Sequence, residues 1–229
     1  MTNKSTKQTP RVRRTNAERS ATTRGKLIEA AIDILYRRGY SAATTIEVAK
    51  QARVSRGAML HQFPARVNML LAVAQHIVEQ QRKHRRDRLG GETGPKRFYA
   101  AAEVSWEVHS QPGAIALLEI ILASRSDGDL RKGLAPFVKS WMDMRTNAAT
   151  RMAADLGVPE TQSFATLVAF QQAALRGLAI EAMFLHNTAQ IDAARKMLTE
   201  YNALFAERLL RETRDTQTRA PTLLRSVGA

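Results

Sequence analysis

Apolar residues recur along most of this chain at the three- and four-residue spacing of an α-helix. After Thr23 they form one stripe, which consists of Leu27, Ala30, Ala31, Ile34 and Leu35. Two arginines followed by Gly39 then predict the end of this first helix. The body of the chain shows no persuasive strand alternation, so we predict an all-α fold.

Two short helices separated by a tight turn are predicted next. Thr44 or Thr45 can cap the first helix, because a hydroxyl oxygen can accept a hydrogen bond from a free backbone amide. Ser55 can cap the second helix, which runs from Arg56 to about Gln62. Arg53 and Val54 form the turn between them.

The rest of the chain continues the helical pattern. A longer helix begins near Ala65, and its basic end, Arg82–Arg88, is interpreted as a solvated face. The glycine-rich stretch 89–95 predicts a domain boundary. Five further helices are expected at about 95–109, 113–124, 129–156, 160–185 and 188–212.

The charge is concentrated at one end of the chain. The 229 residues carry a net charge of +14. Residues 1–90 contain 19 lysines and arginines against 6 acidic residues, whereas residues 91–229 contain 16 against 15. This asymmetry indicates a module for a polyanion, with nucleic acid first and a membrane surface second. A basic surface that serves only solubility is the alternative.

Composition excludes several other classes of protein. The absence of cysteine excludes disulfides and thiolate metal sites. No apolar run is long enough to span a membrane, and the polar, basic start is not a secretory signal, so we expect a cytoplasmic protein. The five histidines lack metal-ligand spacing, and no nucleophile elbow or phosphate-binding glycine loop is present. We therefore expect no enzyme, no cofactor and no metal.

The two short helices fit a helix-turn-helix. The second helix must be slim and polar at its start to enter a major groove about 12 Å wide. Gly57 and Ala58 allow close approach of the backbone, and Arg56 has a guanidinium suited to guanine or phosphate. Met59 and Phe63 are expected to anchor the opposite face of that helix in the core.

The run RGYSAATTIEVAKQARVSRGAMLHQFPAR, residues 38–66, resembles the DNA-binding domain of the tetracycline-repressor (TetR) family. The resemblance extends from Thr23 to about Leu71. It implies phosphate contacts by Thr44, Thr45, Ser55 and Arg66, and base-edge contacts by Arg56, Gly57, Ala58, Leu60 and His61.

Two residues depart from the family pattern. Leu60 replaces the usual tyrosine, which puts a contact through a ring in doubt. Arg53 replaces the turn glycine and disfavours positive φ, so we expect a slightly reshaped turn and an added backbone contact. Simpler alternatives are that Ser55 only caps its helix, that His61 is solvated and that Leu60 packs on a neighbouring helix.

Composition and the breaks in the helical pattern divide the whole chain into segments, and the resemblance implies where it dimerises. We expect a disordered basic arm (1–22), a helix-turn-helix domain with a connecting helix (23–90), a helical effector-binding and dimerisation domain (91–212) and a disordered tail (213–229). The last two long helices, 160–185 and 188–212, are the expected homodimer interface. Their apolar positions can alternatively belong to the core of one chain.

The large side chains of the second domain suit an apolar or aromatic small-molecule effector. The candidate ligand contacts are Trp106, His109, Glu119, Phe137, Trp141, Phe170 and Arg176, although ordinary core packing explains most of them as well. Glu119 lies in an apolar run and needs a partner, either Arg145, Arg176 or a ligand.

The function expected from these features is that of a homodimeric repressor released from an inverted-repeat DNA operator by its ligand. A non-specific nucleic-acid-binding protein without an effector response is the alternative. It would explain the charge, but it would not explain the helix-turn-helix spacing or the long neutral body.

Overall fold

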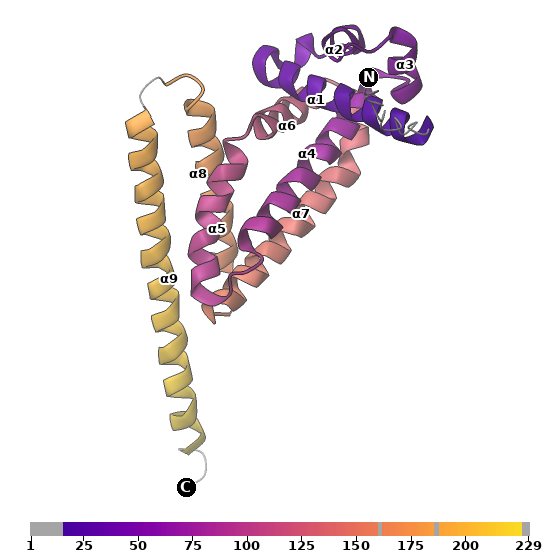
Figure 1. Cartoon of the computed structure of the whole chain (residues 1–229). Helices are drawn as coiled ribbons and strands as arrows, with labels where there is room; N and C mark the ends of the chain where they lie inside the picture. The colour runs from indigo at the N-terminus through magenta and orange to yellow at the C-terminus, as the bar shows by residue number, and fades with distance from the viewer. Residues whose placement is uncertain (1–15, 160–161, 186–187, 226–229) are drawn as a thin grey trace, which may run out of the picture.

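The computed structural model describes residues 16–159, 162–185 and 188–225, which form nine α-helices and no strand (Figure 1). The predicted all-α class is confirmed. The helices are α1 (Asn16–Ala42), α2 (Thr45–Gln51), α3 (Arg56–Gln62), α4 (Arg66–Leu89), α5 (Gly94–His109), α6 (Pro112–Ala123), α7 (Gly128–Leu156), α8 (Gln162–Glu181) and α9 (Thr188–Arg225).

The first three helices form the helix-turn-helix unit, at one end of the molecule (Figure 1). The apolar stripe of α1 is buried as its spacing predicts, and Leu27, Ile34 and Leu35 are fully buried. Met59 and Phe63 are each 1% exposed, which confirms that one face of α3 is anchored in this core. The polar start of α3 is therefore held outward.

The N-terminal helix begins earlier than predicted. Residues 16–22 belong to α1, although the sequence predicted a disordered arm over 1–22. The hydroxyls of Thr22 and Thr23 donate to the carbonyls of Glu18 and Arg19, one turn back, so their polar groups are satisfied within the helix. The remainder of the predicted arm, residues 1–15, lies outside the described residues.

Gly39 interrupts α1 at the predicted place. Its φ of 76° and ψ of 179° are non-helical, and glycine adopts a positive φ without the clash that a Cβ atom would cause. The helical turn that follows ends at Ala42 and leads directly to the cap of α2.

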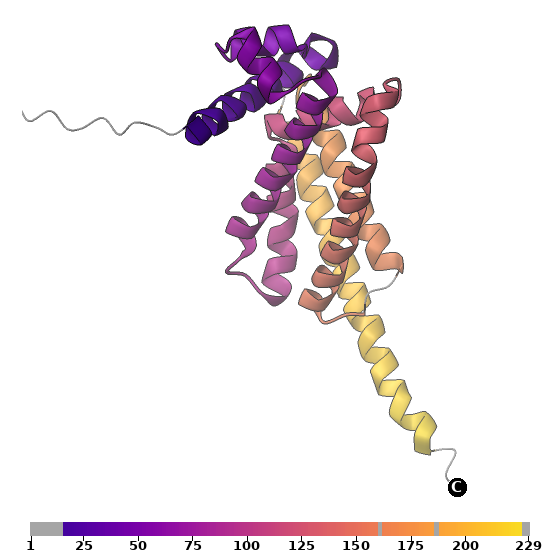
Figure 2. The same cartoon turned by 90° about the vertical axis from the view of Figure 1, so that its right-hand side faces the viewer.

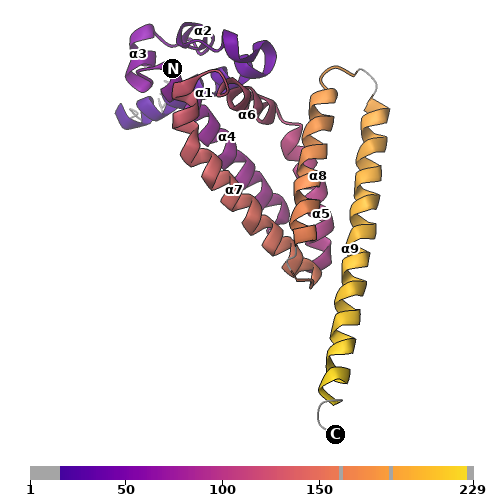
Figure 3. The same cartoon turned by 180° about the vertical axis from the view of Figure 1, so that it is seen from behind.

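The larger helical body contains α4 to α9 (Figures 1 and 3). Helices α4 and α7 lie side by side, α5 packs against α8, and α9 lies outermost. Helix α6 packs across α1, where the two units meet. Ala116, Ile120 and Leu130 of the body join the same hydrophobic core as the helix-turn-helix. None of the described helices is long and apolar enough to cross a membrane.

The C-terminal helix is longer than predicted. Helix α9 continues to Arg225, although residues 213–229 were expected to be a disordered tail, and its last turns extend past the body (Figure 2). Seven of the thirteen residues 213–225 are Arg, Gln, Ala or Leu, which are good helix formers, so the composition that suggested disorder is compatible with a helix. The last four residues of the predicted tail, 226–229, lie outside the described residues.

Candidate DNA-binding surface and internal cavity

The outer face of α3 is a polar surface that we call the recognition surface, made of Ser55, Arg56, Gly57, Leu60 and His61. All five residues are exposed. Ser55 caps the helix, because its Oγ accepts a hydrogen bond from the Ala58 amide at 3.2 Å. A hydroxyl can accept one hydrogen bond and donate another, so this cap leaves the proton of Ser55 available for a phosphate oxygen.

The start of α2 has the same construction. Thr44 Oγ1 accepts a hydrogen bond from the Glu47 amide at 3.2 Å, and Thr44 and Thr45 are both half-buried. Glu47 is in turn paired with Arg38 at 3.1 Å. The predicted phosphate contacts of these threonines remain predictions.

Arg53 adopts a positive φ of 54° in the turn between α2 and α3, although a residue with a Cβ atom disfavours it. The expected reshaping of the turn and the added backbone contact remain predictions. The Arg53 amide donates to the Lys50 carbonyl at 3.1 Å, and the Val54 amide donates to the Ala49 carbonyl at 2.9 Å, which closes the end of α2. These bonds hold Arg53 at its positive φ despite a backbone cost of about 1–2 kcal/mol for a residue with a Cβ atom.

Arg66 is bound to the protein itself. Its guanidinium donates to the backbone carbonyls of Tyr40 and Ala43, and lies 4.0 Å from the centre of the Tyr40 ring. Arg66 therefore fixes the connection between α1 and α2. Its predicted phosphate contact remains a prediction.

Two residues of α1 that were not predicted as functional support the end of α3. Ser20 accepts a hydrogen bond from the Gln62 side chain at 2.7 Å. The Arg24 guanidinium donates to the Gln62 carbonyl at 3.4 Å and lies 4.5 Å from the centre of the Phe63 ring. These contacts join residues about forty positions apart, so no local sequence signal could reveal them.

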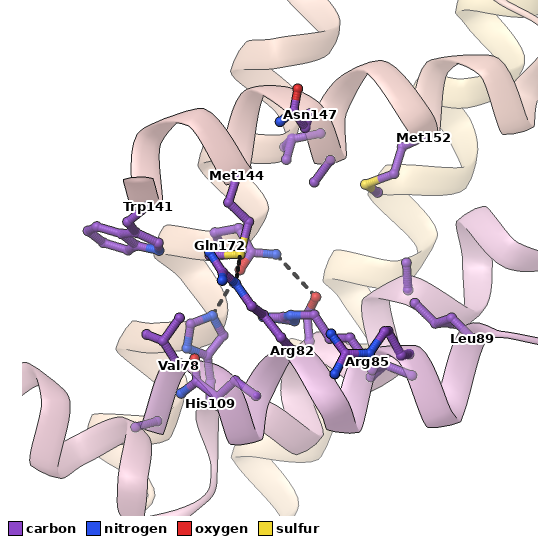
Figure 4. A pocket seen from close by; sticks show the side chains of 18 of the residues that line it. Val78, Arg82, Arg85, Leu89, His109, Trp141, Met144, Asn147, Met152 and Gln172 are labelled. Atoms are coloured by element: carbon purple, nitrogen blue, oxygen red, sulfur yellow. Dashed lines mark hydrogen bonds between the residues drawn. The ribbon is translucent and has the colours of Figure 1, made fainter. Parts of the chain in front are cut away.

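The body contains an internal cavity of about 1000 Å³, bounded by α4, α5, α6, α7 and α8 (Figure 4). Three of the predicted ligand contacts, His109, Trp141 and Arg176, line it. Arg82 and Arg85 line it as well. The interpretation of Arg82–Arg88 as a solvated face is therefore wrong for these two arginines, because one side of α4 faces α5 and α7.

The other four predicted ligand contacts lie outside the cavity lining. Trp106 packs beneath the Arg195 guanidinium, 4.5 Å from its ring centre. Phe137 packs against the core shared with the helix-turn-helix. Phe170 is 52% exposed and contacts Tyr201 edge to face.

Glu119, the fourth of these residues, connects the body to the helix-turn-helix. Its Oε2 accepts a hydrogen bond from the Tyr40 amide at 2.8 Å, next to the interruption of α1 at Gly39. The hydroxyl of Tyr40 donates to Asp127 at 2.8 Å. Since Leu118 and Ile121 of the same helix line the cavity, α6 contacts both the cavity and the DNA-binding unit.

His109 is a neutral base inside the cavity at physiological pH. The pKa of His109 is lowered to about 4, mainly by burial and also by the nearby charges of Arg176 and Arg85, which together outweigh the opposing effect of the hydrogen bond with Gln172. His109 Nε2 lies 3.0 Å from Gln172 Oε1, and Gln172 Nε2 donates to Ser105 Oγ at 3.1 Å. This chain of bonds fixes the imidazole.

The fold and the recognition surface define a helix-turn-helix DNA-binding protein with a second, larger helical domain. Residues 27–73 match the family described as bacterial regulatory proteins, tetR family. The helix-turn-helix part of the chain is thus similar to the DNA-binding domain of this family, and its helical architecture agrees.

Individual relatives support the same assignment. The HTH-type transcriptional regulator CymR of Pseudomonas putida is 44% identical over 77 residues, which cover 34% of this chain and 38% of CymR. The chain is thus matched to well under half the length of that relative. An HTH-type transcriptional regulator of Mycobacterium tuberculosis is 25% identical over 180 residues, covering 73% of this chain and 86% of the regulator.

A solved structure shares the fold over most of the chain. The transcriptional regulator from Saccharomonospora viridis in complex with choline has a TM-score of 0.64 at 17% identity, covering 79% of this chain and 95% of that one. At this identity the likeness concerns the fold alone.

Proposed function

We propose that this protein is a cytoplasmic transcriptional repressor, without catalytic activity, that binds an inverted-repeat operator as a homodimer and is released by a small-molecule effector. The observation that carries this proposal is the pairing of an exposed, capped recognition helix with an internal cavity of about 1000 Å³ in one chain. Helices α4 and α6 contact both regions, so occupancy of the cavity can move the recognition helix.

Exposed apolar side chains on α8, on the residues that directly follow it and on α9 support a homodimer. Seven of the thirteen large hydrophobic residues that are exposed in the described parts of the chain fall between residues 170 and 204. They are Phe170, Met183, Phe184, Leu185, Met197, Tyr201 and Leu204. Such a concentration is typical of a surface that is covered by a partner.

The other apolar positions of these helices are buried within one chain. Phe164, Leu175 and Ile191 are among them, which supports a second role of these helices in the core of one chain. A two-fold dimer would present two recognition helices to half-sites about 34–36 Å apart.

The test is an in vitro selection of bound duplexes from a random DNA pool at physiological salt, with the full-length protein. An inverted repeat is expected. Binding that is only salt-sensitive and has no consensus would refute the operator and favour the non-specific binder, since a specific reader prefers its site by roughly 10³-fold or more.

The selected site then allows a test of Arg56. This exposed residue is expected to contact a base, so Arg56→Ala should weaken binding to the selected site by about 1–3 kcal/mol and leave binding to random DNA nearly unchanged. Lys83→Ala removes a charge from exposed α4 surface and serves as the control. An equal loss on both DNAs would assign Arg56 to phosphate contacts instead.

A further inference from the structure

The cavity carries a strong excess of positive charge. Its lining includes six arginines, at positions 82, 85, 86, 97, 151 and 176, but only two carboxylates, Asp143 and Asp155. His109 is neutral and does not offset this excess. A cavity built for a neutral, purely apolar ligand would not need these charges, because each charged group removed from water lowers stability unless it is paired.

The two carboxylates already have cationic partners. Asp155 lies 3.4 Å from Arg97, and Asp143 lies 3.2 Å from Lys139. Arg86, at the edge of the cavity, is paired with Glu79 at 3.2 Å. Glu79 also lies 3.9 Å from Arg82, so these carboxylates are shared among Arg82, Arg86 and Arg97 and do not reach Arg85.

Among the arginines of the lining, Arg85 has the most unusual surroundings. Among the described residues, no hydrogen bond or ion pair of its guanidinium is found, and burial alone lowers its pKa below the usual range. An arginine does not lose its proton in a protein, so the cost of burial cannot be relieved by neutralisation. Figure 4 shows Arg82 and Arg85 projecting from α4 into the cavity, with Met144 and Met152 of α7 on the other side.

Apart from its charged residues, the cavity wall is largely apolar. Val78, Leu89, Trp141, Met144 and Met152 line the same space. Arg82 makes only long contacts within the cavity wall, 3.4 Å to Met144 Sδ and 3.4 Å to Ser140 Oγ. The site therefore combines room for an apolar body with one or two guanidinium groups that can bind an anion.

We propose that the effector is an organic carboxylate with an apolar body, and that its carboxylate accepts hydrogen bonds from the Arg85 guanidinium. A carboxylate fits this group because its two oxygens match the parallel N–H groups of a guanidinium. The inference rests on the proposed function of the cavity as the effector site and adds the chemical class of the effector. The same anion would lie near His109 and would favour its protonated form.

The test compares acids with neutral counterparts of the same shape. Binding to the full-length protein is measured by calorimetry, without DNA, for octanoate and octanamide and for 4-phenylbutyrate and 4-phenylbutanamide. At least one acid is expected to bind about tenfold or more tightly than its amide. Arg85→Gln should weaken binding of that acid by about 10- to 100-fold and change binding of the amide by less than about threefold.

Lys83→Gln is the matched control, since it removes one positive charge from the exposed side of the same helix and should leave both affinities unchanged. A second measurement follows the His109 ring by NMR, and its pKa of about 4 should rise when the acid is bound.

The possible failures are distinguishable. Three results would overturn the carboxylate inference. The acid and its amide bind with equal affinity, the Arg85→Gln variant keeps the preference for the acid, or none of the four probes binds at millimolar concentration. Operator binding, measured separately, would still stand in each of these cases. Conversely, an acid that binds through Arg85 but does not release DNA would support the inference and refute the proposed release mechanism.

Discussion

Gly57 allows a test in which protein stability and DNA binding should change in opposite directions. It is the second residue of α3, it is exposed, and a Cβ atom built on it would meet nothing within 4 Å. Its φ is not positive, so alanine can adopt the same backbone. Nothing in the protein itself therefore requires glycine at this position.

The expected magnitudes follow from this geometry. Alanine is favoured over glycine in a helix by about 0.5–1 kcal/mol, so Gly57→Ala should raise the free energy of unfolding by up to that amount. At the DNA interface, an added methyl group in a closely packed contact costs about 1–3 kcal/mol. We therefore expect a more stable protein that binds its operator about 5- to 150-fold more weakly.

The assay combines denaturant unfolding with operator binding at constant salt. Gly128→Ala is the matched control, because Gly128 is exposed at the start of α7 and also has open space for a Cβ atom. It should show a similar gain in stability and no loss of DNA affinity. If Gly57→Ala binds the operator like the original protein, the backbone of α3 does not approach the DNA at this residue and the reasoning is refuted.

Three further predictions concern the turn, the link between domains and the cavity. Arg53→Gly should raise the free energy of unfolding by up to about 1 kcal/mol, because it relieves a positive φ. Arg53→Ala should not raise the free energy of unfolding, because alanine keeps the Cβ atom. Equal increases for the two variants in denaturant unfolding would contradict this prediction. Glu119→Ala should lower stability by about 1.5–3 kcal/mol and weaken effector-induced release of DNA at unchanged effector affinity, with Glu119→Gln intermediate. Full release by Glu119→Ala would exclude this link. For His109, the unfolded chain binds more protons than the folded one between pH 6.5 and about 4, so stability should fall as pH decreases through this range, by at most about 3 kcal/mol. His109→Asn should remove that part of the pH dependence, and parallel curves would argue against a neutral His109.

Local patterns predicted the helix-turn-helix almost completely. The caps at Thr44 and Ser55, the anchors Met59 and Phe63 and the interruption at Gly39 depend on nearby residues, so spacing and residue type are sufficient. The predicted helix ends were wrong where they were based on composition and not on the spacing of apolar residues. At both ends of the chain, polar residues were taken as a sign of disorder, although polar side chains can stabilise an exposed helix as well.

The candidate sites were predictable to different degrees. The exposed residues of α3 follow from one short helix, whereas the cavity depends on how five helices pack. Arg82 and Arg85 belong to a basic run that resembles any solvated helix face, and only the packing of α5 and α7 on α4 shows that they point inward. The positive φ of Arg53 could not be predicted for a related reason, because backbone hydrogen bonds of neighbouring residues hold it there.

The contact between α6 and α1 is the most direct route by which a ligand could affect DNA binding. Leu118 and Ile121 face the cavity, and Glu119 between them holds the Tyr40 amide across the domain junction. Tyr40 in turn accepts from Arg66, the first residue of α4. A shift of α6 or α4 must therefore strain bonds that fix the start of the helix-turn-helix. A charge-assisted hydrogen bond of this kind contributes about 1.5–3 kcal/mol, which is comparable to the coupling free energy of about 1–3 kcal/mol found between allosteric sites. If ligand binding breaks one such bond, the free energy lost is therefore large enough to change operator affinity.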